Sequence, residues 1–476
     1  MNKSRLAALG QLPALVFAVV LTACGGGGGG GGGGRGGDAA GASPASPASP
    51  ASPASPASAA SPASAASHPD ASPAPTIETP PVVQAEPTYT IGGTITALKQ
   101  DGLVLANGTD VLNVMSGDTS FTMLGAASKG SAYAVTVQMQ PLWARCTVNN
   151  GSGAAWSSVS NIAVACSPWA EVTTVAGNGT YGYVNGTGSD VRFESPYGIA
   201  KNSAGDFFVA DYANNVIRKV TAEGVVTTFA GNGNRGAVDG GGTNAQFNWP
   251  IGVAVDAADN LYVADSSNHM VRKITPAGGV STLAGNGSDA SVDGDGASAS
   301  FMTMDGVAVD SEGNVFVTES STQKIRKVTP DGQVSTFVDL PISDAGGLAI
   351  DADDNLYLAG NSISKVLKIT KAGMVSTLAG TGDPGSSDGP GAQATFRYPY
   401  GIGVTRDGTV YVGDGGNANI RRIDRNGNVS TIAGTTRGFA DGSNAVAAFK
   451  GLAGIAIGSN GALYVTDNNS IRKVTP

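Results

Sequence analysis

Residues 261–265 read Leu-Tyr-Val-Ala-Asp and lie between an apolar run that begins at Gly252 and a basic segment that contains Arg272. Alternating apolar side chains bounded by Gly, Asn and Asp are typical of short β-strands joined by tight turns. The same pattern occurs in six places, at residues 207–211, 261–265, 315–319, 356–360, 410–414 and 463–467. Regular self-similarity indicates a repeat architecture, so one small unit decides the fold of this region.

Each repeat is predicted to contain four strands. A Gly-led apolar run precedes the repeated segment, a basic strand follows it, and in five copies an outer strand such as residues 280–285 comes next. The sixth copy stops at Pro476 without this outer strand, whereas residues 171–177 match it. We therefore expect the first strand of the region to complete the last unit and close the array into a ring, which protects the strand edges.

These repeats closely resemble the NHL repeat. The eponymous histidine is present as His269, within Asn268-His269-Met270, and the copies agree in order and spacing. The resemblance implies an all-β fold, a six-bladed NHL-type β-propeller that spans residues 169–476 and is closed by its N-terminal strand. A small β-sandwich at residues 86–168 and a disordered Gly/Ser-Pro-Ala linker at residues 24–85 are expected before it.

The N-terminal residues carry the features of an export signal. Two basic residues precede a mostly apolar stretch, which ends in Leu21-Thr22-Ala23-Cys24. This arrangement resembles the lipobox of bacterial lipoproteins, and it implies a signal peptide at residues 1–23, cleavage before Cys24 and lipidation of Cys24. Gly25 rather than Asp follows the cysteine, so the family pattern favours an outer-membrane lipoprotein that faces the periplasm or the cell surface. An ordinary secretory peptide is the alternative.

The segment after Cys24 has no capacity to form a core. Residues 25–34 are an unbroken glycine run, and Ser-Pro-Ala repeats extend from Ser43 to about Pro75. Glycine-rich coil and proline-rich extended chain bury too little apolar surface to offset the entropy of ordering. We expect a stalk that holds the folded parts away from a membrane.

Cys146 and Cys166 are the two cysteines left after Cys24. In an oxidising compartment, two cysteines on strand-like segments favour a structural disulfide, and neither has the spacing or a neighbouring histidine that would activate it. Short alternating apolar runs around them predict the sandwich of residues 86–168. This segment resembles the small Ig-like modules near the N-termini of bacterial surface lipoproteins, and we interpret it as a spacer.

The charge balance limits the classes of partner. Lys and Arg number 28 and Asp and Glu number 37, which gives a formal net charge of −9 at pH 7. Nucleic acids and anionic lipid head groups attract basic surfaces, so the acidic balance argues against both. We expect a monomer that contacts a membrane through its lipid anchor only, and that binds an envelope or extracellular protein, a peptide or a glycan.

Five repeats end their second strand on an acid, at Asp211, Asp265, Glu319, Asp414 and Asp467. The fourth repeat has Gly360 at this position, and it also has Leu367 where the others carry an arginine. Because both residues are lost together, we expect each acid to pair with the arginine of its own blade rather than to form a ligand site. The Asp-Gly steps of the long connections, such as Asp239-Gly240, are predicted turns, and Phe247 is a predicted inter-blade wedge.

The residue before the inner-strand glycine differs between copies, being Tyr197, Ile251, Asp305, Gly346, Tyr400 and Ala453 in turn. These positions are expected to surround the mouth of the axial channel on the face that carries the long connections. Together with two nearby aromatic residues they predict a ligand-binding surface composed of Tyr197, Trp249, Asp305, Tyr398 and Tyr400. The alternative is that they only fill the channel entrance.

The residue types available for catalysis decide between an enzyme and a binding protein. The chain has two histidines, His68 in the linker and His269, so a multi-histidine metal site is excluded. The sequence assigns no catalytic residue, metal ligand or cofactor, and no calcium site is expected at residues 293–296. A non-catalytic binding module is the leading hypothesis. A lactonase-like or lyase-like enzyme that acts through Asp305 near the axial channel is the alternative, and a purely structural surface protein is the third.

Overall fold

The computed structural model describes residues 86–342 and 344–476. The predicted signal peptide, the lipidated Cys24 and the linker lie outside these residues. The described chain is built from β-strands and four 3₁₀ turns, η1 (Gly188–Asp190), η2 (Tyr212–Asn214), η3 (Gly242–Asn244) and η4 (Ser266–Asn268). Over residues 86–342 and 344–476, no helix has the length and apolar character needed to cross a membrane.

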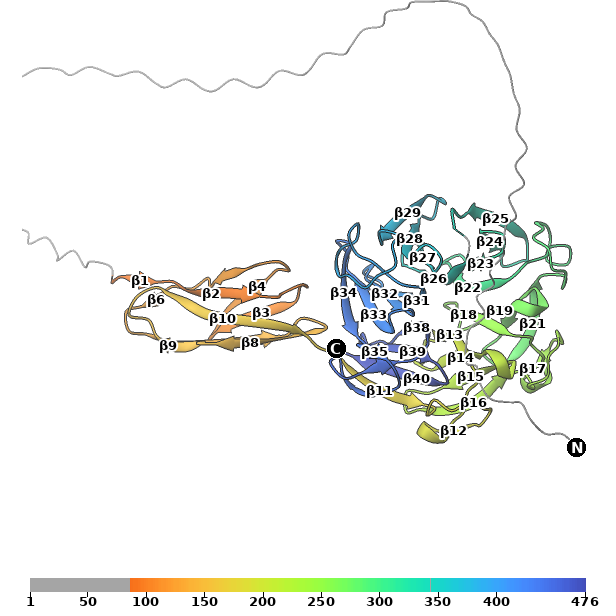
Figure 1. Cartoon of the computed structure of the whole chain (residues 1–476), viewed down its shortest axis with the longest axis horizontal. Coiled ribbons are helices and arrows are strands. Elements are labelled where there is room, and N and C mark those ends of the chain that lie inside the picture. The colour runs from red at the N-terminus through yellow and green to blue at the C-terminus, as the bar shows by residue number, and fades with distance from the viewer. Residues whose placement is uncertain (1–85, 343) are drawn as a thin grey trace, which may run out of the picture. The chain divides into compact units, whose positions relative to one another are not determined.

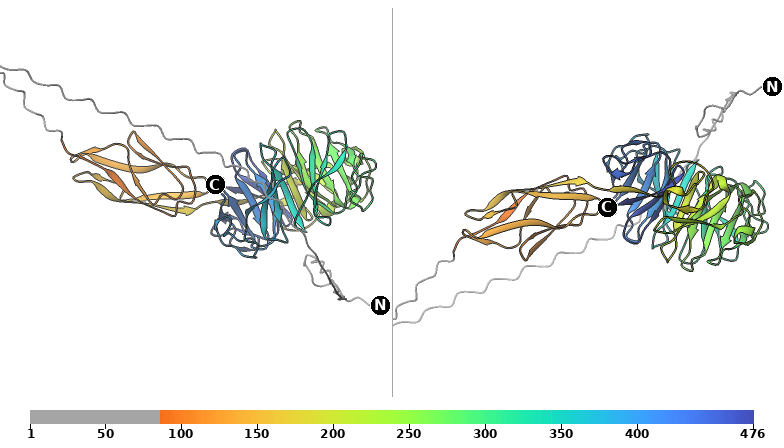
Figure 2. Two further views of the ribbon diagram at one scale, coloured as in Figure 1. Left: turned by 90° about the horizontal axis from the view of Figure 1, so that it is seen from above. Right: turned by 90° about the horizontal axis from the view of Figure 1, so that it is seen from below.

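The first ten strands form a small sandwich (orange to yellow in Figures 1 and 2). One sheet has the order β5 (Ser120–Thr122), β2 (Ile91–Thr96), β10 (Val159–Pro168), β8 (Ala144–Asn149). The other has the order β4 (Asp110–Val114), β3 (Leu103–Asn107), β7 (Ala132–Met139), β9 (Ser152–Ala154). A two-stranded sheet joins β1 (Thr88–Tyr89) and β6 (Ala127–Ser128). Ile91, Leu103 and Ile162 come from both large sheets into one core and are fully buried.

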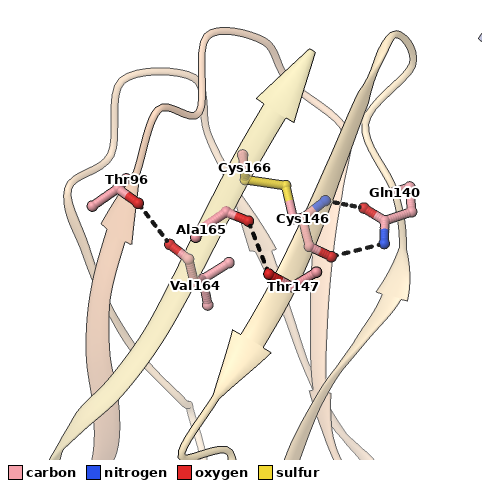
Figure 3. Close-up of a disulfide and its surroundings, with 7 residues drawn as sticks. All are labelled: Thr96, Gln140, Cys146, Thr147, Val164, Ala165 and Cys166. Carbon is pink, nitrogen blue, oxygen red and sulfur yellow. Dashed lines mark hydrogen bonds between the residues drawn. A yellow bond between two sulfur atoms is a disulfide. The ribbon is translucent and has the colours of Figure 1, made fainter. Parts of the chain in front are cut away.

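The disulfide between Cys146 and Cys166 is confirmed (Figure 3). The two residues lie directly opposite each other on β8 and β10, and the Gln140 side chain bonds both backbone groups of Cys146. The resemblance of the sandwich to Ig-like modules stays a prediction.

We expect the paired substitutions Cys146→Ala and Cys166→Ala to lower the free energy of unfolding of the sandwich. The bridge spans a sequence separation of 20 residues, for which loop-closure entropy gives about 3 kcal/mol. Thermal unfolding of wild type and variant, with and without reductant, measures the effect. Reductant should lower the stability of the wild type alone, and an equal effect on the cysteine-free variant would contradict the assignment.

The remaining strands form a propeller, and within residues 86–342 and 344–476 six sheets share one meander order. Figure 1 shows these blades following one another around a ring in chain order, from yellow-green to blue. The inner strands are β13 (Pro196–Lys201), β18 (Pro250–Val255), β22 (Met304–Val309), β26 (Ala345–Ile350), β31 (Pro399–Val404) and β38 (Leu452–Ile457). The second strands are β14 (Phe207–Asp211), β19 (Leu261–Asp265), β23 (Val315–Glu319), β27 (Leu356–Gly360), β32 (Val410–Asp414) and β39 (Leu463–Asp467).

The outer half of each blade completes the meander. The third strands are β15 (Val216–Val220), β20 (Met270–Ile274), β24 (Lys324–Val328), β28 (Lys365–Ile369), β33 (Asn419–Ile423) and β40 (Ser470–Thr475). The outer strands are β16 (Val225–Ala230), β21 (Gly279–Ala284), β25 (Val334–Asp339), β29 (Val375–Ala379), β34 (Asn428–Ala433) and β11 (Glu171–Ala176). Short strands in the inter-blade connections are β12 (Gly186–Thr187), β17 (Gly240–Gly241), β30 (Gly389–Pro390), β35 (Thr436–Arg437), β36 (Gly442–Ser443) and β37 (Ala448–Phe449).

The all-β propeller predicted from the repeats, closed by its N-terminal strand, is confirmed. Strand β11 pairs antiparallel with β40, from Glu171 opposite Thr475 to Thr174 opposite Arg472. The inner strands also close on one another. A Cβ added to Gly252 would lie 2.3 Å from the carbonyl oxygen of Asp305, and one added to Gly454 would lie 2.4 Å from that of Tyr197. The inner-strand glycine is therefore required because neighbouring blades pack backbone against backbone at this point.

The predicted pairing of the repeated acids with arginines is confirmed, and the structure adds a second acid to four of these five pairs. Arg272 is fully buried, 2.7 Å from Asp265 of its own hairpin and 2.6 Å from Asp239 of the preceding connection. Phe247 lies 5.2 Å beneath the guanidinium carbon and is buried as the predicted wedge. Reading Asp239-Gly240 as a simple turn was wrong, because Gly240 begins β17 and Asp239 is an arginine ligand.

This arginine cluster recurs around the ring. Four blades join the arginine to two acids, as Arg272 with Asp265 and Asp239, Arg326 with Glu319 and Asp293, Arg421 with Asp414 and Asp388, and Arg472 with Asp467 and Asp441. In the first blade, Asn185 takes the place of the second acid beside Arg218. Of the two acids at residues 293–296, Asp293 therefore pairs with Arg326, and Asp295 accepts hydrogen bonds from Ser298. In the fourth blade, Leu367 stands in place of the arginine and Gly360 in place of the acid, so the cluster is absent.

Candidate functional site

The inner strands enclose an axial cavity of about 340 Å³. Figure 1 shows β13, β18, β22, β26, β31 and β38 gathered around the centre of the propeller. Aliphatic side chains such as Val253, Val307 and Ile455 make up most of the wall, because the inner faces of these strands are apolar. Asp305, Tyr400 and Lys201 are the polar exceptions in the wall. Such a cavity, apolar with a few placed polar groups, is the usual form of a ligand site.

Asp305 lies on β22 and borders this cavity. Its carboxylate accepts a hydrogen bond from the Ser320 hydroxyl and another from the Tyr400 hydroxyl at 3.4 Å. Burial, together with the charge of Asp344, raises the pKa of Asp305 to about 7, although the hydrogen bond from Tyr400 acts to lower it. Within residues 86–342 and 344–476, no arginine, lysine or histidine forms an ion pair with Asp305, unlike the acids of the arginine clusters.

Four aromatic side chains form a continuous row that begins at Asp305. The rings of Tyr400 and Tyr197 are 5.8 Å apart, those of Tyr197 and Tyr212 are 5.1 Å apart, and Tyr212 stacks on Trp249 at 5.4 Å. We call these residues, Tyr400, Tyr197, Tyr212 and Trp249, the aromatic row. Arg235 closes its outer end, with the guanidinium carbon 4.7 Å above the Trp249 ring.

The tyrosines of the aromatic row remain protonated over the physiological range. Burial raises the pKa of Tyr400 well above its usual value, and the charge of Asp305 raises it further. The same two causes, in the same order, raise the pKa of Tyr197. The phenols therefore act as hydrogen-bond donors and as π faces beside an anionic group.

The backbone at the channel mouth holds bulky residues in an uncommon conformation. Trp249 has φ 56° and Tyr398 has φ 50°, both in the left-handed region immediately before an inner strand. Large side chains rarely adopt this region, at a cost of roughly 1 kcal/mol or more. At the equivalent position Ser195 has φ 52°, so the conformation belongs to the repeat while the aromatic side chains do not. The Trp249 amide is held by the side chain of Asn215 at 3.1 Å.

The structure brings together four of the five predicted ligand-binding residues. Asp305, Tyr400, Tyr197 and Trp249 are linked through the contacts above. Tyr398 is placed apart from them, since its side chain is 57% exposed and the described residues give it no ring contact with the aromatic row.

Three contributors to the mouth were missed from the sequence, Tyr212, Ser320 and Asp344. Tyr212 and Ser320 follow the repeated acids Asp211 and Glu319, at a position that also differs between copies. The comparison of repeats that singled out Tyr197 would have found them. Asp344 lies in the short connection before β26, where the repeat pattern is interrupted.

Metal-binding residue types do not gather at the mouth. Among residues 86–342 and 344–476, no three His, Cys, Asp or Glu side chains are grouped so that they could hold a metal ion. His269 lies in the turn after η4, where its Nδ1 is 3.8 Å from Asp289.

Comparisons with known proteins find relatives for the region that contains the repeats. The family model described as SMP-30/Gluconolactonase/LRE-like region matches residues 256–346, which include Asp305. The protein SUPPRESSOR OF QUENCHING 1, chloroplastic, from Arabidopsis thaliana is 27% identical over 319 residues, which are 63% of this chain and 26% of that protein. NHL repeat-containing protein 2 from Bos taurus is 32% identical over 150 residues, 28% of this chain and 20% of that protein. The chain thus spans about a quarter or less of the curated relatives it matches.

A solved structure extends the likeness to most of the chain. An auxiliary nutrient binding protein from Bacteroides ovatus aligns with a TM-score of 0.53 at 15% identity, over 83% of this chain and 98% of that one. At this identity the likeness concerns the fold alone. The chain is therefore similar to NHL-repeat and SMP-30-like proteins, and what it shares with them is the β-propeller.

Proposed function

We propose that this protein is a non-catalytic binding module of the cell envelope, which holds a protein, peptide or glycan on the long-connection face of its propeller. In this proposal a chain end or a small group of the ligand enters the axial cavity beside Asp305. The rest of the ligand lies along the aromatic row. The similar fold of a nutrient-binding protein supports a binding role without specifying the ligand.

The observation that carries the proposal is the continuity of the row with the cavity. Ring-to-ring distances of 5.1–5.8 Å connect Asp305, through three tyrosines, to Trp249. A core built only for stability has no need of a large aromatic side chain at position 249, where the first blade has Ser195, or of a carboxylate without a cation. Rigid, half-buried aromatic side chains bind ligands at low entropic cost, which suits this surface to recognition.

The lactonase-like or lyase-like alternative is favoured by one observation. Asp305, with a pKa of about 7, lies in a cavity and within the segment that matches the family model described with gluconolactonase. Such a carboxylate can serve as a general base near neutral pH. If the purified chain hydrolyses lactones and Asp305→Asn abolishes this activity, the enzyme would replace the binding module as the proposed function.

The binding proposal is tested by capture from a cell-envelope extract. We expect the chain to retain a defined ligand and the double variant Tyr197→Leu, Tyr400→Leu to retain at least tenfold less of it. Asp353→Asn, an exposed change in the turn between β26 and β27, serves as the folded control. Equal capture by the double variant would remove this face from consideration.

Display on the envelope is tested separately through Cys24. We expect Cys24→Ser to move the protein from the membrane fraction to the soluble fraction, because several acyl chains at ~0.8 kcal/mol per buried CH₂ are lost together. Fractionation and labelling with a radioactive fatty acid measure the change. A wild type that carries no label and is recovered in the soluble fraction, as the variant is, would favour the ordinary secretory peptide.

A further inference from the structure

Asp305 is half-buried at the channel mouth and has no ion pair among the described residues, whereas each fully buried acid of the propeller is paired with a cation. Asp211, Asp265, Glu319, Asp414 and Asp467 are each within 3.0 Å of an arginine nitrogen. Burying a carboxylate costs free energy unless an opposite charge or strong hydrogen bonds offset it. Asp305 has two hydroxyl donors instead, Ser320 and Tyr400. A ligand could supply the missing positive charge.

The groups that the structure places against Asp305 carry no positive charge. Ser320 comes from the end of β23, Tyr400 from β31, Tyr197 from β13, and Asp344 from the connection before β26. The hydroxyls are neutral donors, and Asp344 adds a second negative charge. Among the described residues, no ion pair joins Asp305 to a basic side chain, although Lys201 lines the same cavity. Arg235 is over Trp249 at the outer end of the aromatic row, and Lys201 ends β13, four residues beyond Tyr197.

The aromatic row supplies the second element of a cation site. The negative face of an aromatic ring attracts ammonium and guanidinium groups. Trp249 demonstrates this within the molecule, because it already carries the guanidinium of Arg235 at 4.7 Å. The inner pair, Tyr197 and Tyr400, has no such partner among residues 86–342 and 344–476, and it adjoins Asp305.

The cavity wall indicates which chemical group of the ligand should adjoin its positive charge. Behind Asp305 the inner strands present Val253, Val307 and Ile455. An apolar wall accommodates an aliphatic stem and excludes a hydrated metal ion, which needs several oxygen ligands. Asp305 and Asp344 are too few for such an ion, and no third ligand is grouped with them in the described chain.

We propose that the channel mouth binds an organic cation, an ammonium group on an aliphatic stem, which pairs with Asp305 and packs against the rings of Tyr197 and Tyr400. A free alkylamine and the lysine side chain of a peptide share this chemistry. This inference rests on the proposed binding function and names the ligand class for the same site.

The experiment titrates the full chain at pH 8 with matched probes by calorimetry. Pentylamine is compared with its neutral counterpart 1-pentanol. The peptide Gly-Lys-Gly, acetylated at its N-terminus and amidated at its C-terminus, is compared with the same peptide acetylated at Nε. We expect each charged probe to bind at least tenfold more tightly than its neutral match. Asp305→Asn should lose at least tenfold in affinity for the charged probes, whereas Asp353→Asn should lose none. Binding by Gly-Lys-Gly but not pentylamine would assign the ligand to peptides, and the reverse to free amines.

Three outcomes would overturn the inference. These are equal binding of charged and neutral probes, full affinity in Asp305→Asn, or stoichiometric binding of Ca²⁺ that competes with pentylamine. The proposed function survives each of them if Tyr197→Leu, Tyr400→Leu still loses the ligand captured from envelope extract. Charged probes that bind equally well to that double variant would instead contradict both, because their site would then lie elsewhere.

Discussion

Replacing Arg272 by leucine should lower the free energy of unfolding of the propeller by roughly 3–5 kcal/mol, the cost of leaving one partner of a buried ion pair alone. The guanidinium is fully buried and donates to Asp265, Asp239 and the carbonyl oxygens of Gln246 and Val238. Leucine leaves the Asp265 carboxylate in the interior without its cation. Denaturant unfolding followed by tyrosine and tryptophan fluorescence measures the loss.

A second variant separates charge from packing. Asp265→Asn combined with Arg272→Leu removes the stranded charge, while the amide oxygen still accepts the Asn248 N–H that Asp265 accepts at 2.8 Å. We expect this double variant to regain roughly 2 kcal/mol of the loss, since the uncompensated charge is the largest part of it. Lys371→Leu, which breaks the ion pairs of this exposed lysine with Glu312 and Asp354, should change stability by about 1 kcal/mol or less. A loss as large as that of Arg272→Leu would contradict the explanation by burial.

The fourth blade shows why the sequence predicted one acid of the arginine cluster and not the other. Sequence comparison found Gly360 and Leu367 together and correctly inferred the ion pair within each hairpin. It could not assign Asp239 to Arg272, because these residues belong to different repeats and meet only through the pairing of β17 with β21. The fourth blade also follows a short connection, from Asp339 to Ala345. The second acid, the phenylalanine and the long connection are therefore absent together.

The propeller itself was predictable because its signal is local and repeated. Strand periodicity, turn residues and the strand found at residues 171–177 each depend on short stretches of chain, and copies reinforce one another. The disulfide followed from there being two cysteines to pair. The outer-membrane anchor at Cys24 depends on residues outside the described structure and stays a prediction.

The site was less predictable because a ring brings distant positions together. Comparing repeats singled out Tyr197, Asp305 and Tyr400, since a residue that differs between copies is not required by the scaffold. It did not reveal that Ser320 would donate to Asp305, or that Tyr212 would bridge Tyr197 to Trp249. Those contacts depend on the angle between neighbouring blades. For the same reason, the sequence comparison grouped Tyr398 with the other mouth residues, whereas in the structure its side chain faces solvent.

Asp305→Asn should stabilise the protein, and the gain should grow with pH. Burial raises the pKa of Asp305 to about 7, whereas an aspartate in the unfolded chain titrates near ~4. Between these values the folded state binds the proton more tightly, so stability is fully present below about pH 4 and is lost as pH rises through about 7. Asparagine keeps the shape and does not titrate. The two proteins should therefore be about equally stable at pH 4 and differ above pH 7.

The difference in stability between wild type and Asp305→Asn also tests the proposed ammonium ligand. Three pH units correspond to about 4 kcal/mol as an upper limit, and water in the channel should reduce it to roughly 1–3 kcal/mol. Denaturant unfolding of wild type and Asp305→Asn at pH 4, 6 and 8 measures the difference, with Asp353→Asn as the control that should show no trend. A saturating alkylammonium should cancel the gain by pairing with the wild-type carboxylate. A constant difference across pH would show that the pKa of Asp305 is the same in the folded and unfolded states, and it would contradict the effect of burial on this carboxyl group.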